Sequence, residues 1–233
     1  MPVPALEAVV FDMDGTLVDS ERLSFAAWAP AARELGIEVP EELIRQFIGR
    51  NKHSYMSILA DHLNGDLDLA WRLYDLHIEY FNRAAAVELE AKPGALEALE
   101  ALHAAGVRLA VASSSPIEAI EQRLRDAGML DKFSVLVSGD EVAKSKPEPD
   151  IFVEAARRMG VEPAACAAIE DSFNGVRSGH AAGMRTFMVP DLLEPTPEIA
   201  ALCERVLASL HELPAALGVA SADAPVAGAA DGR

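Results

Sequence analysis

Hydrophobic residues follow two alternating patterns along most of this chain. Stretches with apolar residues three and four positions apart, the spacing of a helix face, are separated by short apolar runs. These runs are rich in β-branched residues and predict strands at 6–11, 107–112, 133–137, 166–169, 186–189 and 206–207. Strands that alternate with helices form a parallel sheet covered by helices on both faces. The pattern therefore predicts an α/β fold with a doubly wound, Rossmann-like sheet.

Residues 20–87 interrupt this alternation. Four apolar stripes follow one another at helical spacing, and glycines end the first three. Because this insert separates the first strand from the others, we expect an α/β core built from 1–19 and 88–218, with a four-helix cap built from 20–87. The tail 219–233 is rich in alanine, glycine and aspartate, and we expect it to be disordered.

Three large aromatic residues of the insert, Trp28, Phe47 and Trp71, lie on these stripes. Together they could form a stacking platform for a ligand. Their helical spacing instead favours packing in the interior of the cap.

Composition narrows the classes of partner. The chain has 233 residues, of which 51% are apolar and 24% charged, an ordinary globular balance. Its net charge of −17 argues against nucleic acids and anionic membranes as partners, because both require a basic surface. The first residues lack the basic and apolar stretches of a secretion signal, so we expect a cytoplasmic protein, as a monomer or small homo-oligomer. A small anionic substrate stays compatible with this charge, since a bound metal can reverse the local field.

The strongest chemical signal is the segment 12–19, which directly follows the first predicted strand. Asp12 and Asp14 are two residues apart, so in an extended segment they project to the same side, and Gly15 permits a sharp turn after them. Two carboxylates aimed into one crevice repel each other unless a cation or a shared proton intervenes. The alternative interpretation of these residues alone is an ordinary Asp-Gly turn with solvated acids.

Three further polar patches fall at or beyond the ends of other predicted strands. Ser113 follows the strand 107–112, Lys146 follows 133–137, and Glu170 with Asp171 closes 166–169. The carboxyl ends of parallel strands lie at one edge of a sheet, where ligands bind in such folds. We therefore expect acids, hydroxyls and one lysine to meet at a single site.

These residues carry a resemblance. Four segments resemble the four motifs of the haloacid dehalogenase-like superfamily. They are Asp-Met-Asp-Gly-Thr-Leu-Val-Asp-Ser from Asp12, the strand-terminal Ser113, Ser-Lys-Pro-Glu-Pro-Asp around Lys146, and Glu-Asp-Ser-Phe-Asn-Gly from Glu170. They occur in order and at similar spacing, over 6–189. The insert resembles the helical cap of the branch that contains phosphoglycolate phosphatases, small sugar phosphatases and beta-phosphoglucomutase.

The resemblance implies a phosphatase that acts on a small phosphate ester. Asp12 would be the nucleophile and become transiently phosphorylated, and Asp14 would be the general acid and base. Ser113 and Lys146 would bind the transferring phosphoryl group. Backbone N–H groups near Met13 and Ser114 would assist.

The resemblance also implies a magnesium ion. Its ligands would be the Asp12 carboxylate, the Asp14 backbone carbonyl and Asp171, with Glu170 acting through water. Oxygen ligands with retained waters are what Mg²⁺ prefers.

Two alternatives to a phosphatase stay open. A mutase resembling beta-phosphoglucomutase would carry a histidine at the position of Ser24 and a lysine at that of Pro116, so their absence favours the phosphatase. A protein that binds a phosphorylated metabolite without turnover would be expected to have lost some of these groups, and all are present. Asp14 argues against dehalogenases and phosphonatases, which lack an acid there.

Substrate choice is expected to reside in the cap, since the core contacts only the phosphate. The cap segment 49–53 supplies the candidate substrate-binding residues Gly49, Arg50, Asn51 and Lys52. Its cations would suit a substrate with a second anionic or polyhydroxyl end. The alternative is a solvated loop that caps a helix.

Overall fold

A computed structural model describes residues 5–47 and 52–219, with the side chains of 52–54 left out. One sheet of six parallel strands runs through the core, in the order β3-β2-β1-β4-β5-β6. The strands are β1 (Ala8–Phe11), β2 (Arg108–Ser113), β3 (Val135–Ser138), β4 (Cys166–Glu170), β5 (Arg185–Met188) and β6 (Arg205–Val206). The predicted α/β class and all six predicted strands are confirmed, with ends that agree to within two residues.

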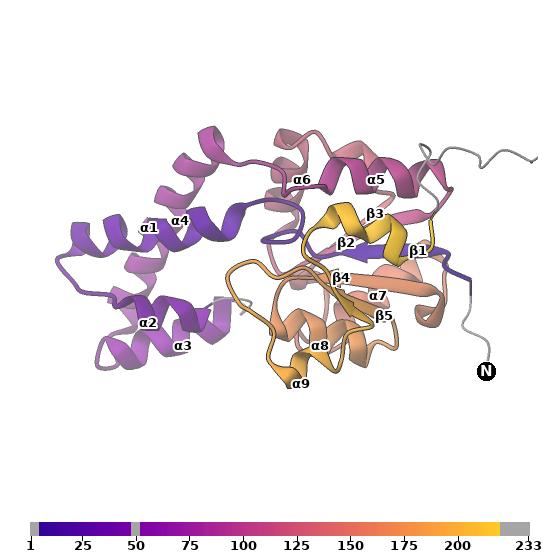
Figure 1. Cartoon of the computed structure of the whole chain (residues 1–233). Coiled ribbons are helices and arrows are strands. Elements are labelled where there is room, and N and C mark those ends of the chain that lie inside the picture. The colour runs from indigo at the N-terminus through magenta and orange to yellow at the C-terminus, as the bar shows by residue number, and fades with distance from the viewer. Residues whose placement is uncertain (1–4, 48–51, 220–233) are drawn as a thin grey trace, which may run out of the picture.

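Helices cover both faces of this sheet. Alternate residues of β1 point to opposite faces, and they are buried on each of them. Val9 and Phe11 pack into a hydrophobic cluster with α5 (Ala95–Ala104) and α6 (Ile117–Asp126), and with α10 (Leu213–Ala216). Ala8 and Val10 belong to a second cluster with α7 (Asp150–Met159). Figure 1 shows α5 and α6 on one side of the sheet, and α7 with α8 (Phe173–Ala181) on the other.

The insert forms a separate helical layer beyond one end of the sheet (Figure 1). It contains α1 (Ser20–Leu35), α2 (Glu41–Ile44), α3 (Lys52–His62) and α4 (Leu67–Glu88). This confirms the four-helix cap, although the second helix is short and continues as a 3₁₀ turn over Arg45–Phe47. α1 ends where Gly36 adopts the left-handed conformation, with φ 67°, which glycine allows without steric cost. The short helix α9 (Pro197–Ala200) was not predicted.

Core and cap are joined by two adjacent segments. The Asp19 N–H donates to the Glu90 carbonyl at 2.9 Å, and Val18 bridges Ala91 in antiparallel fashion. The insert therefore leaves the core and returns to it at one place, beside the carboxyl end of β1. Within 5–47 and 52–219, no helix has the length and apolarity needed to span a membrane.

Candidate phosphoryl-transfer site

The residues predicted to act together lie at the carboxyl edge of the sheet. Asp12 follows β1, which lies between β2 and β4, and its N–H donates to the Ile169 carbonyl at 2.9 Å. Ser113 ends β2 and Glu170 ends β4. In this topology the strand order reverses around β1, and such a switch point leaves a crevice for ligands. A cavity of about 420 Å³ opens there, and the predicted residues that line it are Asp12, Asp14, Ser113, Ser114, Lys146 and Asp171.

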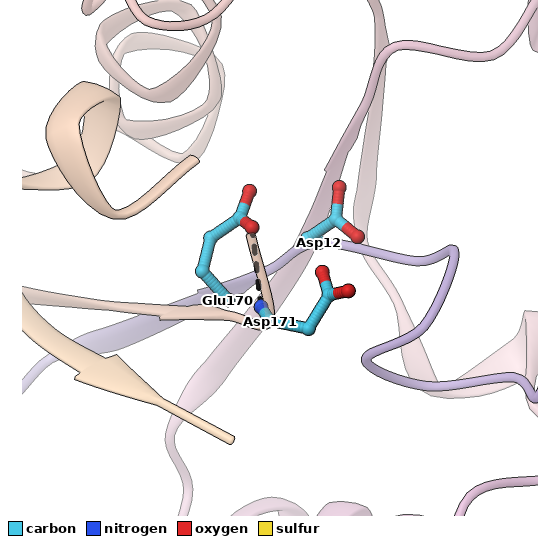
Figure 2. A group of neighbouring side chains, drawn as sticks. All are labelled: Asp12, Glu170 and Asp171. Carbon is cyan, nitrogen blue, oxygen red and sulfur yellow. Dashed lines mark hydrogen bonds between the residues drawn. The ribbon is translucent and has the colours of Figure 1, made fainter. Parts of the chain in front are cut away.

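Three buried carboxylates gather where β1 and β4 end (Figure 2). One oxygen from each of Asp12, Glu170 and Asp171 lies within 4.8 Å of the others. Burial raises the pKa of Asp12 and of Asp171 well above the usual range, and neighbouring carboxylates raise both further. Such a cluster needs positive charge to be ionised, and its all-oxygen donor set fits a hard divalent cation such as Mg²⁺.

Lys146 supplies part of that charge. Its Nζ donates to Asp12 Oδ1 at 2.5 Å, to Glu170 Oε1 at 2.6 Å and to the Ala112 carbonyl at 3.0 Å. Burial by itself lowers the pKa of Lys146, but the two carboxylates outweigh it and raise the pKa above its usual value. Lys146 is therefore a permanent cation beside Asp12.

Two glycines allow the acids to approach. A Cβ on Gly175 would lie 1.8 Å from Glu170 Cδ, and a Cβ on Gly15 would lie 2.4 Å from Asp171 Oδ2. Ser172 donates to Glu170 Oε2 from its N–H at 3.2 Å and from Oγ at 3.0 Å, which fixes that carboxylate. The glycines of both acidic motifs are therefore required by packing.

The Asp14 side chain lies apart from the three-carboxylate cluster. It accepts hydrogen bonds from Ser20 at 2.6 Å, Ser115 at 2.8 Å and Arg123 at 2.6 Å. Burial acts to raise its pKa, but the Arg123 charge and the hydrogen bonds outweigh burial, so that the pKa is lowered. Any metal contact of Asp14 would consequently come from its backbone.

The sequence interpretation did not identify Arg123 or Glu21. Arg123 lies three residues after buried Ile120, on the same face of α6, and its guanidinium lies 4.7 Å from the centre of the Phe81 ring in the cap. The three-residue spacing from a buried residue was the one sequence signal that could have pointed to Arg123. Glu21 also lines the cavity, where burial and the charges of Asp14 and Asp191 raise its pKa to about 8.

The cap forms the other wall of the cavity. Trp28 and Phe47 are buried in the cap interior as predicted, although both also reach the cavity. For Trp71 the prediction was wrong, because this residue lines the cavity and is 39% exposed. Its position near the start of α4 leaves it outside the buried stripe.

Other predicted positions have mixed outcomes. Gly49, Arg50 and Asn51 lie outside the described residues; Lys52 begins α3, but its side chain is not among those described. Met13 is fully buried, so only its backbone could meet a phosphate.

Ser24 lies beside a histidine from another helix, since its carbonyl accepts from His77 Nε2 at 3.0 Å. Burial lowers the pKa of His77 to about 4, which keeps this imidazole neutral.

Comparisons with known proteins agree with this architecture. The haloacid dehalogenase-like hydrolase family matches residues 6–183. The chain is 33% identical to a phosphoglycolate phosphatase of Nitrosospira multiformis, over 91% of this chain and 95% of that protein. It is 35% identical to a phosphorylated carbohydrates phosphatase of Thermotoga maritima, over 77% and 82%. The crystal structure of CbbY from Rhodobacter sphaeroides in complex with phosphate superposes with a TM-score of 0.78 at 30% identity, covering 91% of this chain and 99% of that one. The chain therefore belongs to the haloacid dehalogenase-like hydrolase family.

Proposed function

We propose that this phosphatase hydrolyses a small phosphorylated metabolite through a phosphorylated Asp12. The observation that supports it best is the cluster of Asp12, Glu170 and Asp171 in the crevice between β1 and β4, with the Lys146 ammonium bound to the first two. The cavity beside the cluster is large enough to enclose a small ligand. The chain's net charge of −17 supports a small-molecule substrate over a nucleic acid, and we propose that the enzyme acts in the cytoplasm, as a monomer or small homo-oligomer.

In the first step an Asp12 oxygen attacks phosphorus and the bond to the alcohol oxygen breaks. Asp14, whose pKa is lowered in the free protein, takes up a proton as the substrate binds and gives it to the departing alcohol, which leaves Asp14 ionised and Asp12 phosphorylated. In the second step Asp14 takes a proton from water, whose oxygen attacks the same phosphorus and releases inorganic phosphate. Asp12 is then regenerated and Asp14 is protonated again. Ser113 and Lys146 hold the phosphoryl oxygens in both steps.

Asp12, Asp171 and the Asp14 carbonyl would hold Mg²⁺, with Glu170 acting through water. When bound, Mg²⁺ supplies the charge that keeps these acids ionised and neutralises the phosphoryl oxygens. The raised pKa of Asp12 supports this need, because a protonated Asp12 is a poor nucleophile.

Replacement of the nucleophile tests the proposal. Asp12→Asn should lower Mg²⁺-dependent release of phosphate from p-nitrophenyl phosphate by on the order of 10⁴-fold or more, since the attacking oxygen is lost. Asp126→Asn, at the exposed end of α6, is the matched control and should keep full activity. An acid-quenched reaction should also contain phosphorylated wild-type enzyme and no phosphorylated Asp12→Asn. Equal turnover by the two variants would contradict the mechanism.

The mutase stays the alternative to hydrolysis. Pro116 lines the cavity at the place where a mutase would carry a lysine, so this wall lacks one cation for a second phosphate. Conversion of a hexose 1-phosphate to the 6-phosphate in the presence of the bisphosphate would show a mutase, whereas release of phosphate alone supports the phosphatase.

The cap segment 49–52 stays our candidate for contacts to the remainder of the substrate. Arg50→Ala and Lys52→Ala should raise KM for the physiological substrate and leave p-nitrophenyl phosphate turnover nearly unchanged. Equal losses on both substrates would contradict this role.

A further inference from the structure

The cavity has two walls of opposite character. Among the lining residues, the core contributes acids, serines, Lys146 and Arg123, with Pro116 as its apolar member within the described part of the chain. The cap contributes mainly rings and branched chains: Phe25, Trp28, Ile44, Phe47, Tyr55, Trp71, Tyr74, Ile78 and Phe81. Within the described residues, one end of the ligand therefore meets charged groups and hydroxyls, and the other meets mainly rings and aliphatic side chains.

The polar groups of the cap wall gather close to the core. Ser20, Glu21 and Ser24 lie in the first two turns of α1, and Ser20 donates to Asp14 at 2.6 Å. His77 adds no charge, because burial keeps its imidazole neutral and its Nε2 is bound to the Ser24 carbonyl. In the part of the chain that the structure describes, the cap wall beyond these groups carries no ionised side chain.

Aromatic rings line the cap wall in an unbroken series. Ring centres are 5.0 Å apart for Trp28 and Phe47, 5.6 Å for Phe47 and Tyr55, 5.8 Å for Tyr55 and Tyr74, and 6.0 Å for Tyr74 and Trp71. At its end, Trp71 is 39% exposed although it belongs to the cavity. The exposed part of a large ring beside a cavity is stabilised when an apolar ligand covers it.

We propose that the alcohol part of the substrate carries a flat aromatic ring, which binds against this series of rings while its phosphate lies at Asp12. The inference rests on the proposed function and names its substrate class. Against the rings of the described cap wall, the carboxylate of a ligand such as a phosphorylated sugar acid would lose its hydration. An aromatic ring gains there by stacking and by burial of apolar surface.

Two esters with equally poor leaving groups test this choice. 2-Phenylethyl phosphate and ethyl phosphate both release a primary alcohol, so they differ mainly in the ring. We expect kcat/KM to be on the order of 30- to 100-fold higher for 2-phenylethyl phosphate, as expected for burial of one phenyl ring. Hexose 6-phosphates and 2-phosphoglycolate should fall near the ethyl ester. Equal kcat/KM for the two esters, or faster turnover of the sugar esters, would overturn the inference.

A pair of variants on one helix locates the ring. Trp71→Ala should lower the preference for 2-phenylethyl phosphate by about 5- to 10-fold, because it removes one face of the stack. Leu67→Ala, one turn earlier on α4, is the matched control: Leu67 is 57% exposed and is not a cavity residue, so the preference should be unchanged. A loss by Trp71→Ala that is equal for both esters would show a structural role and contradict the assignment.

A binding measurement separates this inference from the proposed function. Calorimetry with the unreactive 2-phenylethylphosphonate and ethylphosphonate, on the full chain with Mg²⁺, should give about 30-fold tighter binding of the aromatic compound. Equal affinities would overturn the inference even if both esters are hydrolysed. If neither ester releases phosphate, the proposed function fails, and the two phosphonate affinities still decide the inference.

Discussion

The Lys146 ammonium donates hydrogen bonds to two buried carboxylates, Asp12 and Glu170, and a third carboxylate, Asp171, lies beside them. The sequence could predict the members of this group because each follows a strand end, where a parallel sheet collects its polar residues. It could not predict which side chains pair. Lys146 and Asp12 are 134 positions apart, and their 2.5 Å contact depends on the register of three strands. For the same reason the pairing of Arg123 with Asp14 was missed.

Gly175→Ala tests the packing of the acidic cluster. The added Cβ would collide with Glu170, so either α8 or the carboxylate must move. We expect the free energy of unfolding to fall by about 1–3 kcal/mol, as for other overpacked interiors, and Mg²⁺ affinity to weaken. Urea unfolding with and without Mg²⁺ measures both.

The control for this variant is Arg177→Ala on the same helix. It removes an exposed ion pair with Glu198, which is worth at most about 1 kcal/mol. If Gly175→Ala were as stable as this control and bound Mg²⁺ with unchanged affinity, the close approach of Gly175 to Glu170 would be required neither for stability nor for metal binding.

At the scale of elements, the hydrophobic pattern predicted the helices and strands that are long enough to show a repeat of apolar positions. The strands appeared as apolar runs, and α1, α3 and α4 each span several turns of a regular stripe. α9 has four residues, which is about one turn and too short for a repeat, whereas the stripe that predicted α2 was completed by the 3₁₀ turn Arg45–Phe47. The contact of Arg123 on α6 with the Phe81 ring on α4 was also beyond the sequence, since a contact between two helices depends on how core and cap are oriented.

Arg123→Met tests the role of this residue between the two helices. α6 presents Arg123 to Asp14 on one side and to the Phe81 ring of α4 on the other. Without the guanidinium, Asp14 loses the group that orients it, so kcat/KM for ethyl phosphate, which reports the steps up to phosphorylation of Asp12, should fall by about 10- to 100-fold. kcat/KM for p-nitrophenyl phosphate should fall by less than about 3-fold, because p-nitrophenolate leaves without a proton.

Arg125→Met is the control, since Arg125 lies two residues further along α6 with an exposed pair to Glu121. It should change neither rate. A similar drop in kcat/KM for both esters by Arg123→Met would mean that Arg123 supports the fold rather than the orientation of Asp14.

For the whole molecule, the raised pKa values of Asp12, Asp171 and Glu21 predict how stability depends on pH. Between their usual pKa values near 4 and the raised ones, about 8 for Glu21, the folded chain holds more protons than the unfolded chain. These groups therefore make the metal-free protein less stable as pH rises through that window. Mg²⁺ competes with protons for the ionised acids, so its stabilising effect should grow from pH 5.5 to pH 8.

Thermal unfolding in EDTA and in excess Mg²⁺ at both pH values measures this dependence. A Mg²⁺ concentration 100 times its Kd should add about 2.7 kcal/mol at pH 8 and less at pH 5.5. An equal gain at the two pH values would contradict a metal site built from these carboxylates.

Excision of the cap tests the division of labour between the two layers. The segments that enter and leave the insert are hydrogen-bonded to each other through Asp19 and Glu90, so a short Gly/Ser linker in place of 21–88 can join them without strain. The shortened chain keeps Asp12, Lys146 and the acids of β4, together with both hydrophobic clusters of the sheet. It should therefore fold and retain Mg²⁺-dependent release of phosphate from p-nitrophenyl phosphate, at a reduced rate because water enters the open site. It should also hydrolyse the aromatic and ethyl esters at similar kcat/KM, since the wall that distinguishes them is gone. If the shortened chain folded and still preferred the aromatic ester, selectivity would belong to the core and the role given to the cap would be wrong.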